Sequence, residues 1–139
     1  MATPKRGLRE VKVSRYMTSN LVTFTAEMEI MQAVHVLIKH KFSGAPVVDT
    51  KGKLIGMLSE KDCLRVAVLA DKPGFDAPLV GDYMATQVDT VSPDASLFDV
   101  ASRFAKVSYK RFPVVDQGKL VGQISRTDVL RAIDDLGLS

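Results

Sequence analysis

The sequence predicts a mixed α/β (α+β) fold, in which two related β-α-β-β-α repeats pack as one pseudo-twofold body. The first observation is repetition: Tyr16-Met17 recurs 67 positions later as Tyr83-Met84, and Pro46-Val47-Val48-Asp49 recurs at the same offset as Pro113-Val114-Val115-Asp116. The second is that helical and strand-like apolar patterns alternate in the same order in each half. The third is size, because a half of about 60 residues buries too little surface to be stable alone.

The repetition continues beyond these anchors with a small change of register. Gly56, Ser59 and Asp62 recur 66 positions later, so one residue is missing from the second copy. The gap lies between Asp49-Thr50-Lys51-Gly52 and Asp116-Gln117-Gly118, which are polar, glycine-containing stretches typical of hairpin turns. Because such turns tolerate changes of length, the gap supports two copies of one folded unit.

Each element of the first half follows from its residue pattern. Leu21–Thr25 is predicted to be a short strand, and apolar residues at helical spacing predict a helix after it. The apolar face of that helix comprises Ile30, Met31, Val34, Leu37 and Ile38. Pro46–Val48 and Leu54–Leu58 predict a buried hairpin, and Ser59 begins a helix over Glu60–Leu69. The second half repeats these elements at Thr90–Val91, Leu97–Ala105, Pro113–Val115, Leu120–Ile124 and Thr127–Ile133.

These elements define two repeats, residues 13–69 and 80–135. The residues between them, 70–79, are rich in proline and glycine and are predicted to be a linker. A basic tail at residues 1–12 precedes the first repeat, and residues 136–139 are expected to form a C-terminal tail.

Composition and charge exclude several classes of protein. Of the 139 residues, 46% are hydrophobic and 25% are charged, with a net charge of +3, which suits a folded chain rather than a disordered one. No apolar run approaches the roughly 20 residues that span a bilayer, and the N-terminal stretch lacks the apolar core of a secretory signal. We therefore expect a cytoplasmic protein that does not enter the membrane.

Residues that bind metals or act as nucleophiles form no recognisable group. Cys63 is the single cysteine, which excludes an internal disulfide, and His35 and His40 lie five residues apart, which places them on different faces of a helix. Gly122-Gln123-Ile124-Ser125-Arg126 lacks the second glycine of a nucleophile elbow. We therefore expect no metal site, no catalytic residues and no enzymatic activity.

A Ser-x-x-Asp motif follows the last strand of each repeat, as Ser59 with Asp62 and Ser125 with Asp128. One interpretation is structural: the serine caps the helix and the aspartate completes the cap. The other is functional, because a helix N-terminus attracts phosphate and a carboxylate one turn inside accepts hydrogen bonds from ribose hydroxyls. A cap alone does not require Gly56 and Gly122 before it, and these glycines indicate a close approach to the backbone.

The doubled order of Tyr-Met, amphipathic helix, Pro-Val-Val-Asp, Gly-Lys-Leu, Gly and Ser-x-x-Asp resembles the tandem cystathionine-β-synthase (CBS) domain pair, or Bateman module. The resemblance covers about Val13 to Ile133. It implies a ligand-sensing unit with two clefts for AMP, ADP, ATP or S-adenosylmethionine and no required cofactor. It also implies a homodimer in the form of a disc, a free-standing module and a regulated protein whose identity stays unknown.

In the family, each cleft combines the Ser-x-x-Asp helix of one repeat with residues of the other. By position, the resemblance places Met57, Ser59 and Asp62 in one cleft with Asp89, Lys110 and Arg111. It places Ser125, Arg126 and Asp128 in the other cleft with Val22, Phe42 and Ser43. Lys110, Arg111 and Arg126 are candidates to face phosphates, whereas Glu60, at the first helical position, would repel a phosphate there. Met17 and Met84 are expected to be buried, although the matching family positions often lie near the ligand.

The sequence thus favours a regulatory module that binds an adenine nucleotide or S-adenosylmethionine and responds by a change of conformation or assembly. A ligand-free scaffold with degenerate clefts is the first alternative. Nucleic-acid binding is the second, motivated by a pI near 9.1 and by Lys39-His40-Lys41 and Lys110-Arg111. The small net charge, the 6% content of aromatic residues and the lack of a DNA-binding motif weaken this second alternative.

Overall fold

The computed structural model describes residues 7–73 and 76–137, so part of the predicted N-terminal tail, residues 74–75 of the linker and the last two residues lie outside it. The chain forms two compact units. Unit 1 is described over residues 7–21 and 89–137, and unit 2 over residues 22–73 and 76–88. Each unit combines helices with a two-stranded antiparallel sheet, which confirms the predicted mixed fold class.

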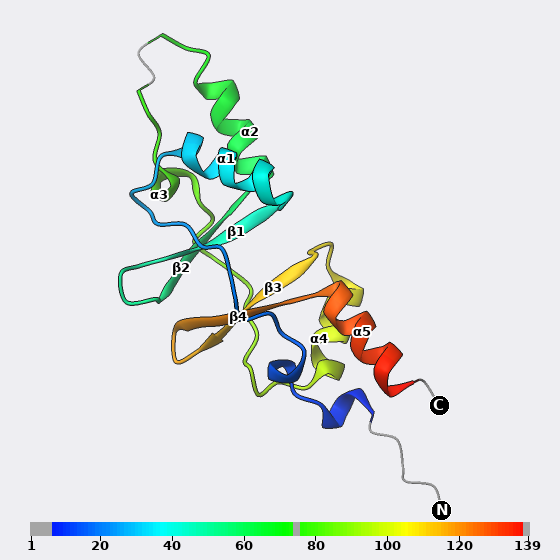
Figure 1. The fold of residues 1–139 in the computed structure, drawn as a ribbon. Coiled ribbons are helices and arrows are strands. Elements are labelled where there is room, and N and C mark those ends of the chain that lie inside the picture. The colour runs from blue at the N-terminus through cyan, green and yellow to red at the C-terminus, as the bar shows by residue number, and fades with distance from the viewer. Residues whose placement is uncertain (1–6, 74–75, 138–139) are drawn as a thin grey trace, which may run out of the picture. The chain divides into compact units, whose positions relative to one another are not determined.

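Unit 2 is built on the hairpin of β1 and β2, with two helices packed beside each other (Figure 1). Its elements are α1 (Ile30–His40), β1 (Gly44–Val48), β2 (Leu54–Ser59), α2 (Glu60–Leu69) and the short α3 (Val80–Tyr83). Phe24, Val47, Leu58 and Val80 have no exposed surface and form the centre of its core.

Unit 1 repeats this plan with the hairpin of β3 and β4 (Figure 1). Its elements are the 3-10 helices η1 (Leu8–Glu10) and η2 (Val13–Arg15), then α4 (Leu97–Lys106), β3 (Arg111–Asp116), β4 (Lys119–Ser125) and α5 (Arg126–Leu136). Phe112, Leu97, Ile124 and Val13 are buried at its centre, and Phe104 packs on Phe112 with ring centres 4.6 Å apart.

Each compact unit consists mostly of one repeat and includes the first segment of the other repeat. Val13 belongs to the first repeat, yet it is fully buried in unit 1, and its N–H donates to the Ala95 carbonyl at 2.9 Å. Val80 belongs to the second repeat, yet it is fully buried in unit 2, and its N–H donates to the Met28 carbonyl at 2.8 Å. The boundaries of the repeats, residues 13–69 and 80–135, therefore do not coincide with the boundaries of the compact units.

The strands predicted at Leu21–Thr25 and Thr90–Val91 are not strands of either sheet. Each segment makes one parallel bridge, Phe24 with Val47 and Val91 with Val114. Phe24 still donates to the Pro46 carbonyl and accepts from the Val48 N–H, both at 2.9 Å. One residue in bridge geometry is too short for a strand, although its side chain is buried as a strand residue would be.

Two further predictions differ from the structure. The single apolar face predicted for α1 is split, because Ile30 and Leu37 are buried while Met31 and Ile38 are 58% and 70% exposed. Residues 8–12, predicted to be part of a tail, are packed: Val11 is 3% exposed in the core of unit 1, and η1 contacts α4.

Candidate functional site

The Ser-x-x-Asp motifs form reciprocal caps at the starts of α2 and α5. Asp62 N–H donates to Ser59 Oγ at 3.3 Å and Ser59 N–H donates to Asp62 Oδ2 at 2.9 Å. The same bonds at Ser125 and Asp128 measure 3.1 and 2.8 Å. The structural interpretation is therefore confirmed at both sites, since the serine and the aspartate of each motif accept a hydrogen bond from each other's main-chain N–H.

The second oxygen of each aspartate is held by an arginine one turn further along the helix. Arg65 Nη2 lies 2.6 Å from Asp62 Oδ1, and Arg131 Nη2 lies 3.1 Å from Asp128 Oδ1. The aspartate side chains are only 13% and 8% exposed. The cap fixes Oδ2 of each aspartate, and the arginine lies against Oδ1, as a hydrogen bond from Arg65 to Asp62 and as an ion pair between Arg131 and Asp128. Each carboxylate is therefore held at both oxygens, and a ligand hydroxyl would share Oδ1 with the arginine.

Gly56 and Gly122 are needed because another part of the chain lies against them. A Cβ on Gly56 would lie 2.5 Å from Met84 Sδ and 2.8 Å from the Ala85 carbonyl oxygen. A Cβ on Gly122 would lie 2.7 Å from the Sδ of Met17 and 3.0 Å from the Thr18 carbonyl oxygen. The predicted close approach is confirmed, and the neighbour in each unit is the first segment of the other repeat rather than the ligand that the pattern suggested.

Three cationic residues of the same unit lie at the start of α5 or beside it in the chain's hydrogen bonding. Arg126 N–H donates to the Lys110 carbonyl at 3.1 Å, and Arg111 pairs with Ser125 in the sheet. Arg126 Nη2 also donates to the Val107 carbonyl at 3.1 Å. Lys110, Arg111 and Arg126, which the resemblance divided between two clefts, thus lie around one helix start, and pairing of the hairpin brings them there.

The start of α2 has a different environment. Glu60 N–H donates to the Ser43 carbonyl at 2.9 Å, and Phe42 packs on the core while its ring stacks on His40 at 5.2 Å. Val22 is also packed against the unit 2 core, and Met57 pairs with Ala85 through two 2.9 Å hydrogen bonds. Glu60 is exposed at the first helical position, so this helix start carries an acidic side chain where α5 carries a basic one.

The two predicted clefts each take residues from both units. Ser59 and Asp62 belong to unit 2, whereas Asp89, Lys110 and Arg111 belong to unit 1, where Asp89 is exposed. The second cleft likewise combines unit 1 residues with Val22, Phe42 and Ser43 of unit 2. These combinations stay predictions.

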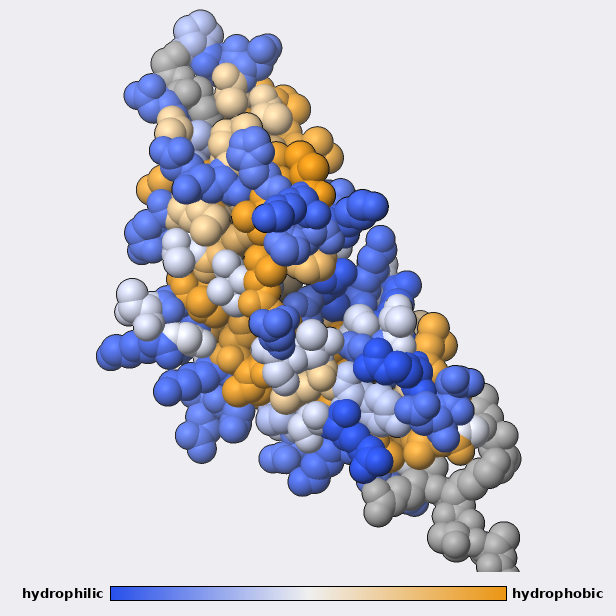
Figure 2. All heavy atoms as spheres, viewed as in Figure 1, coloured by the Kyte–Doolittle hydropathy of each residue, from blue (hydrophilic) through white to orange (hydrophobic). Residues whose placement is uncertain are grey.

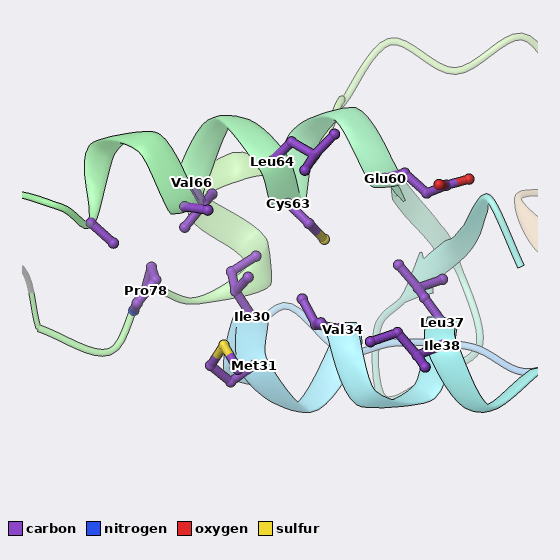
Figure 3. Close-up of a pocket in the computed structure, with 12 residues that line it drawn as sticks. Ile30, Met31, Val34, Leu37, Ile38, Glu60, Cys63, Leu64, Val66 and Pro78 are labelled. Atoms are coloured by element: carbon purple, nitrogen blue, oxygen red, sulfur yellow. The ribbon is translucent and has the colours of Figure 1, made fainter. Parts of the chain in front are cut away.

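An apolar groove that the sequence did not predict lies between α1 and α2 (Figure 3). It encloses about 410 Å³, and side chains from both helices, including Val34 and Cys63, point into the gap. Burial raises the pKa of the Cys63 thiol, and the carboxylates of Asp62 and Glu60 raise it further. Hydrophobic surface is exposed over these helices (Figure 2), from Met31, Ile38, Leu64, Val68 and Leu69.

The described residues contain no group of three or more side chains that could hold a metal ion, and His35 and His40 are both exposed. None of the helices that the structure describes is long and apolar enough to cross a bilayer.

Comparison with known proteins gives one consistent result. The family model for the CBS domain matches residues 13–69 and 80–135. A zinc metalloprotease of Methanocaldococcus jannaschii is 36% identical over 94% of this chain and 34% of its own length. The crystal structure of CBSX2 of Arabidopsis thaliana in complex with AMP is 30% identical, has a TM-score of 0.77, and matches over 89% of this chain and 96% of that chain.

The CBS domain pair of protein MJ0100, in complex with 5′-methylthioadenosine and S-adenosylmethionine, is also similar. It is 26% identical with a TM-score of 0.73, over 90% of this chain and 97% of that chain. The chain spans 42%, 34% and 15% of the lengths of the first three curated relatives, so in each of them it corresponds to a minor part.

Proposed function

The chain belongs to the CBS domain family, with two copies of the domain, and from this premise we propose that it is a regulatory module that binds adenosine-containing ligands. The candidate ligands are AMP, ADP, ATP and S-adenosylmethionine, bound without any required cofactor. Binding would change the conformation or assembly of the module and so control a partner protein in the cytoplasm. The structures of similar domain pairs in complex with AMP and with S-adenosylmethionine support this proposal.

The observation that carries the proposal is the pair of oriented carboxylates, Asp62 and Asp128. Each is more than four-fifths buried, held at one oxygen by the helix cap and at the other by an arginine. A carboxylate fixed in this way can accept hydrogen bonds from the two adjacent hydroxyls of a ribose without changing its orientation. We propose binding rather than catalysis, including where relatives carry the domain within enzymes.

The charges at the two helix starts support different ligands. At α5, Arg126, Lys110 and Arg111 add positive charge to the positive end of the helix, which favours phosphate groups. At α2, Glu60 opposes phosphate, so a ligand with little negative charge, such as S-adenosylmethionine, suits it better. We propose the nucleotide site at Ser125 and Asp128, completed as the resemblance implies by Val22, Phe42 and Ser43.

The proposal predicts that Asp128→Ala weakens AMP binding by about 100-fold, because the loss of a charged acceptor to two hydroxyls removes roughly 2–3 kcal/mol. Asp62→Ala should weaken the binding of S-adenosylmethionine more than the binding of AMP. Isothermal titration calorimetry with AMP, ADP, ATP, S-adenosylmethionine and GTP would measure both. Asp99→Ala is the matched control, because Ser96 and Asp99 form the same motif at the start of α4, where Asp99 is exposed and Ser96 Oγ accepts from its N–H.

Equal binding by wild type and both site variants would contradict the proposed site. Failure of every adenosine compound to bind the wild type would contradict the proposed function and leave the ligand-free scaffold. Duplex DNA binding that falls steeply with salt would instead support the nucleic-acid alternative.

We further propose that the module forms a homodimer through the groove between α1 and α2. Exposed apolar side chains line this groove, and α1 has Glu27 and Glu29 before its start and Lys39-His40-Lys41 at its end, all exposed. An antiparallel pair of α1 helices would therefore place acidic ends beside basic ends. In unit 1, by contrast, Phe98, the repeat equivalent of Met31, is covered by Arg9 with 3.6 Å between the guanidinium carbon and the ring centre.

Leu64→Glu is expected to convert this dimer to a monomer, because it places a charge on an apolar surface where Leu64 is 67% exposed in the single chain. Sedimentation equilibrium over a dilution series would measure an increase of at least about 100-fold in the dimer dissociation constant. Thr50→Glu, which adds the same charge in the exposed hairpin turn, is the control. A dimer unchanged by Leu64→Glu would place the interface elsewhere.

A further inference from the structure

Arg131 connects the Asp128 carboxylate with the segment of chain that leaves unit 1. We call residues 16–21 the exit segment, because the first stretch of unit 1 ends at Leu21 and unit 2 begins at Val22. Arg131 Nη2 lies 3.1 Å from Asp128 Oδ1 and donates to the main-chain carbonyl of Tyr16 at 3.3 Å. One cationic nitrogen thus touches both the candidate ribose acceptor and the start of the exit segment.

The exit segment is fixed to unit 1 at two more points. Tyr16 Oη donates to Asp135 Oδ2 at 2.8 Å, and this hydrogen bond raises the pKa of Tyr16. Thr18 and Gln123 exchange two main-chain hydrogen bonds of 2.9 Å. If the exit segment moves away from unit 1, the bond between Arg131 and the Tyr16 carbonyl is lost, and the arginine that orients Asp128 loses one of its anchors.

The second anchor of Tyr16 exists in only one repeat. The residue equivalent to Asp135 in the first repeat is Leu69, whose side chain has no hydrogen-bond acceptor. Arg65, the equivalent of Arg131, lies 2.6 Å from Asp62. In unit 1, the unit whose helix start is cationic, Tyr16 therefore has an anchor on Asp135 that Leu69 cannot provide at the equivalent position.

We propose that Arg131 is a positioning residue that couples Asp128 to the exit segment, so that occupation of Asp128 and closure of the exit segment stabilise each other. By linkage, whatever holds Asp128 in its bound orientation also favours the closed segment, and the effect is reciprocal. The part of the inference that concerns a ligand rests on the proposed function; the coupling itself does not. Through this coupling, ligand binding at Asp128 in unit 1 would affect the exit segment, which is connected directly to unit 2.

The coupling can be tested without ligand by a double-mutant cycle. Hydrogen exchange of the amides at residues 16–18 is measured by mass spectrometry in wild type, Asp128→Asn, Arg131→Met and the double variant. Asp128→Asn should accelerate exchange about 5-fold in the wild-type background and less than about 2-fold in the Arg131→Met background. This difference is the size expected for one charge-assisted hydrogen bond, that of Arg131 to the Tyr16 carbonyl. Arg131→Lys, which keeps the charge, should restore part of the effect. Equal acceleration in both backgrounds would overturn the proposal.

AMP extends the test to the bound state. At 100 times its dissociation constant, AMP should slow exchange at residues 16–18 by up to roughly 100-fold in wild type and by less than about 3-fold in Arg131→Met. Slower exchange in α5 would show that AMP is bound in both proteins. Arg65→Met is the matched control and should keep the wild-type response. If AMP slowed exchange equally with and without Arg131, the coupling would be overturned. If the wild type showed the coupling without ligand but did not bind AMP, only the proposed function would be contradicted.

Discussion

Val13→Asp is expected to unfold unit 1, although Val13 lies in the first repeat of the sequence. Val13 has no exposed surface and packs with residues of the second repeat, including Phe112 and Leu97. An unpaired carboxylate at this position would destabilise the unit by about 3–5 kcal/mol, a large part of the roughly 5–15 kcal/mol that stabilises a typical domain. Hydrogen exchange measured by mass spectrometry at peptide resolution should show loss of protection in α4, β3, β4 and α5.

The equivalent substitution Val80→Asp should act on the other unit. Val80 is fully buried with Phe24 and Leu58, so protection should be lost in α1, β1, β2 and α2. Val107→Asp, at a position that is 36% exposed, is the control and should change stability by less than about 1 kcal/mol. If Val13→Asp removed protection from α1 and α2 instead, the packing of the first segment of each repeat in the other unit would be contradicted.

Gly56→Ala is expected to destabilise unit 2 by about 1–3 kcal/mol, because the new methyl group overlaps a packed neighbour. The Met84 side chain can move, but the Ala85 carbonyl at 2.8 Å from the new Cβ is main chain and is fixed by hydrogen bonds to Met57. Gly122→Ala should have the same sign and a smaller effect, because its corresponding distances are longer, 2.7 Å to Met17 Sδ and 3.0 Å to the Thr18 carbonyl. Urea denaturation would measure both free energies of unfolding.

Two further variants separate the side-chain from the main-chain overlap. Adding Met84→Ala to Gly56→Ala should leave a residual penalty that comes from the Ala85 carbonyl, once the cost of Met84→Ala alone is subtracted. Gly7→Ala is the control, since no heavy atom lies within 4 Å of a Cβ at that position. A stability unchanged by Gly56→Ala would show that the first segment of the second repeat does not press on this glycine.

Local elements were predictable where a pattern of several residues agreed with a capping or turn residue. The helix beginning after Ser59 is an example, because Ser59 and Asp62 accept hydrogen bonds from each other's main-chain N–H whatever the rest of the chain does. The hairpins were also predictable, since glycine at the turn has a positive φ of 81° at both Gly52 and Gly118. Leu21–Thr25 was predicted to be a strand, but only Phe24 pairs there, in a single bridge to Val47.

The candidate site was predictable in part for the same reason. Ser125 and Asp128 are adjacent through local geometry, so their motif identified both residues and their cap. Arg131 was missed, because its importance depends on Tyr16, which is remote in the sequence. The groove of unit 2 was missed because the apolar spacing of α1 does not show which of its residues a neighbouring helix covers.

The sequence by itself determined the duplication, the family, the order of the elements and the two Ser-x-x-Asp motifs, because each of these depends on residue types and short spacings. Tertiary structure alone decided that Val13 and Val80 exchange places between the units, that Gly56 and Gly122 accommodate protein rather than ligand, and that one helix start gathers three cations. Contacts of this kind join residues that are far apart in the chain. For Val13 and Val80 the energy comes from apolar burial, which has no direction and leaves no fixed spacing in the sequence.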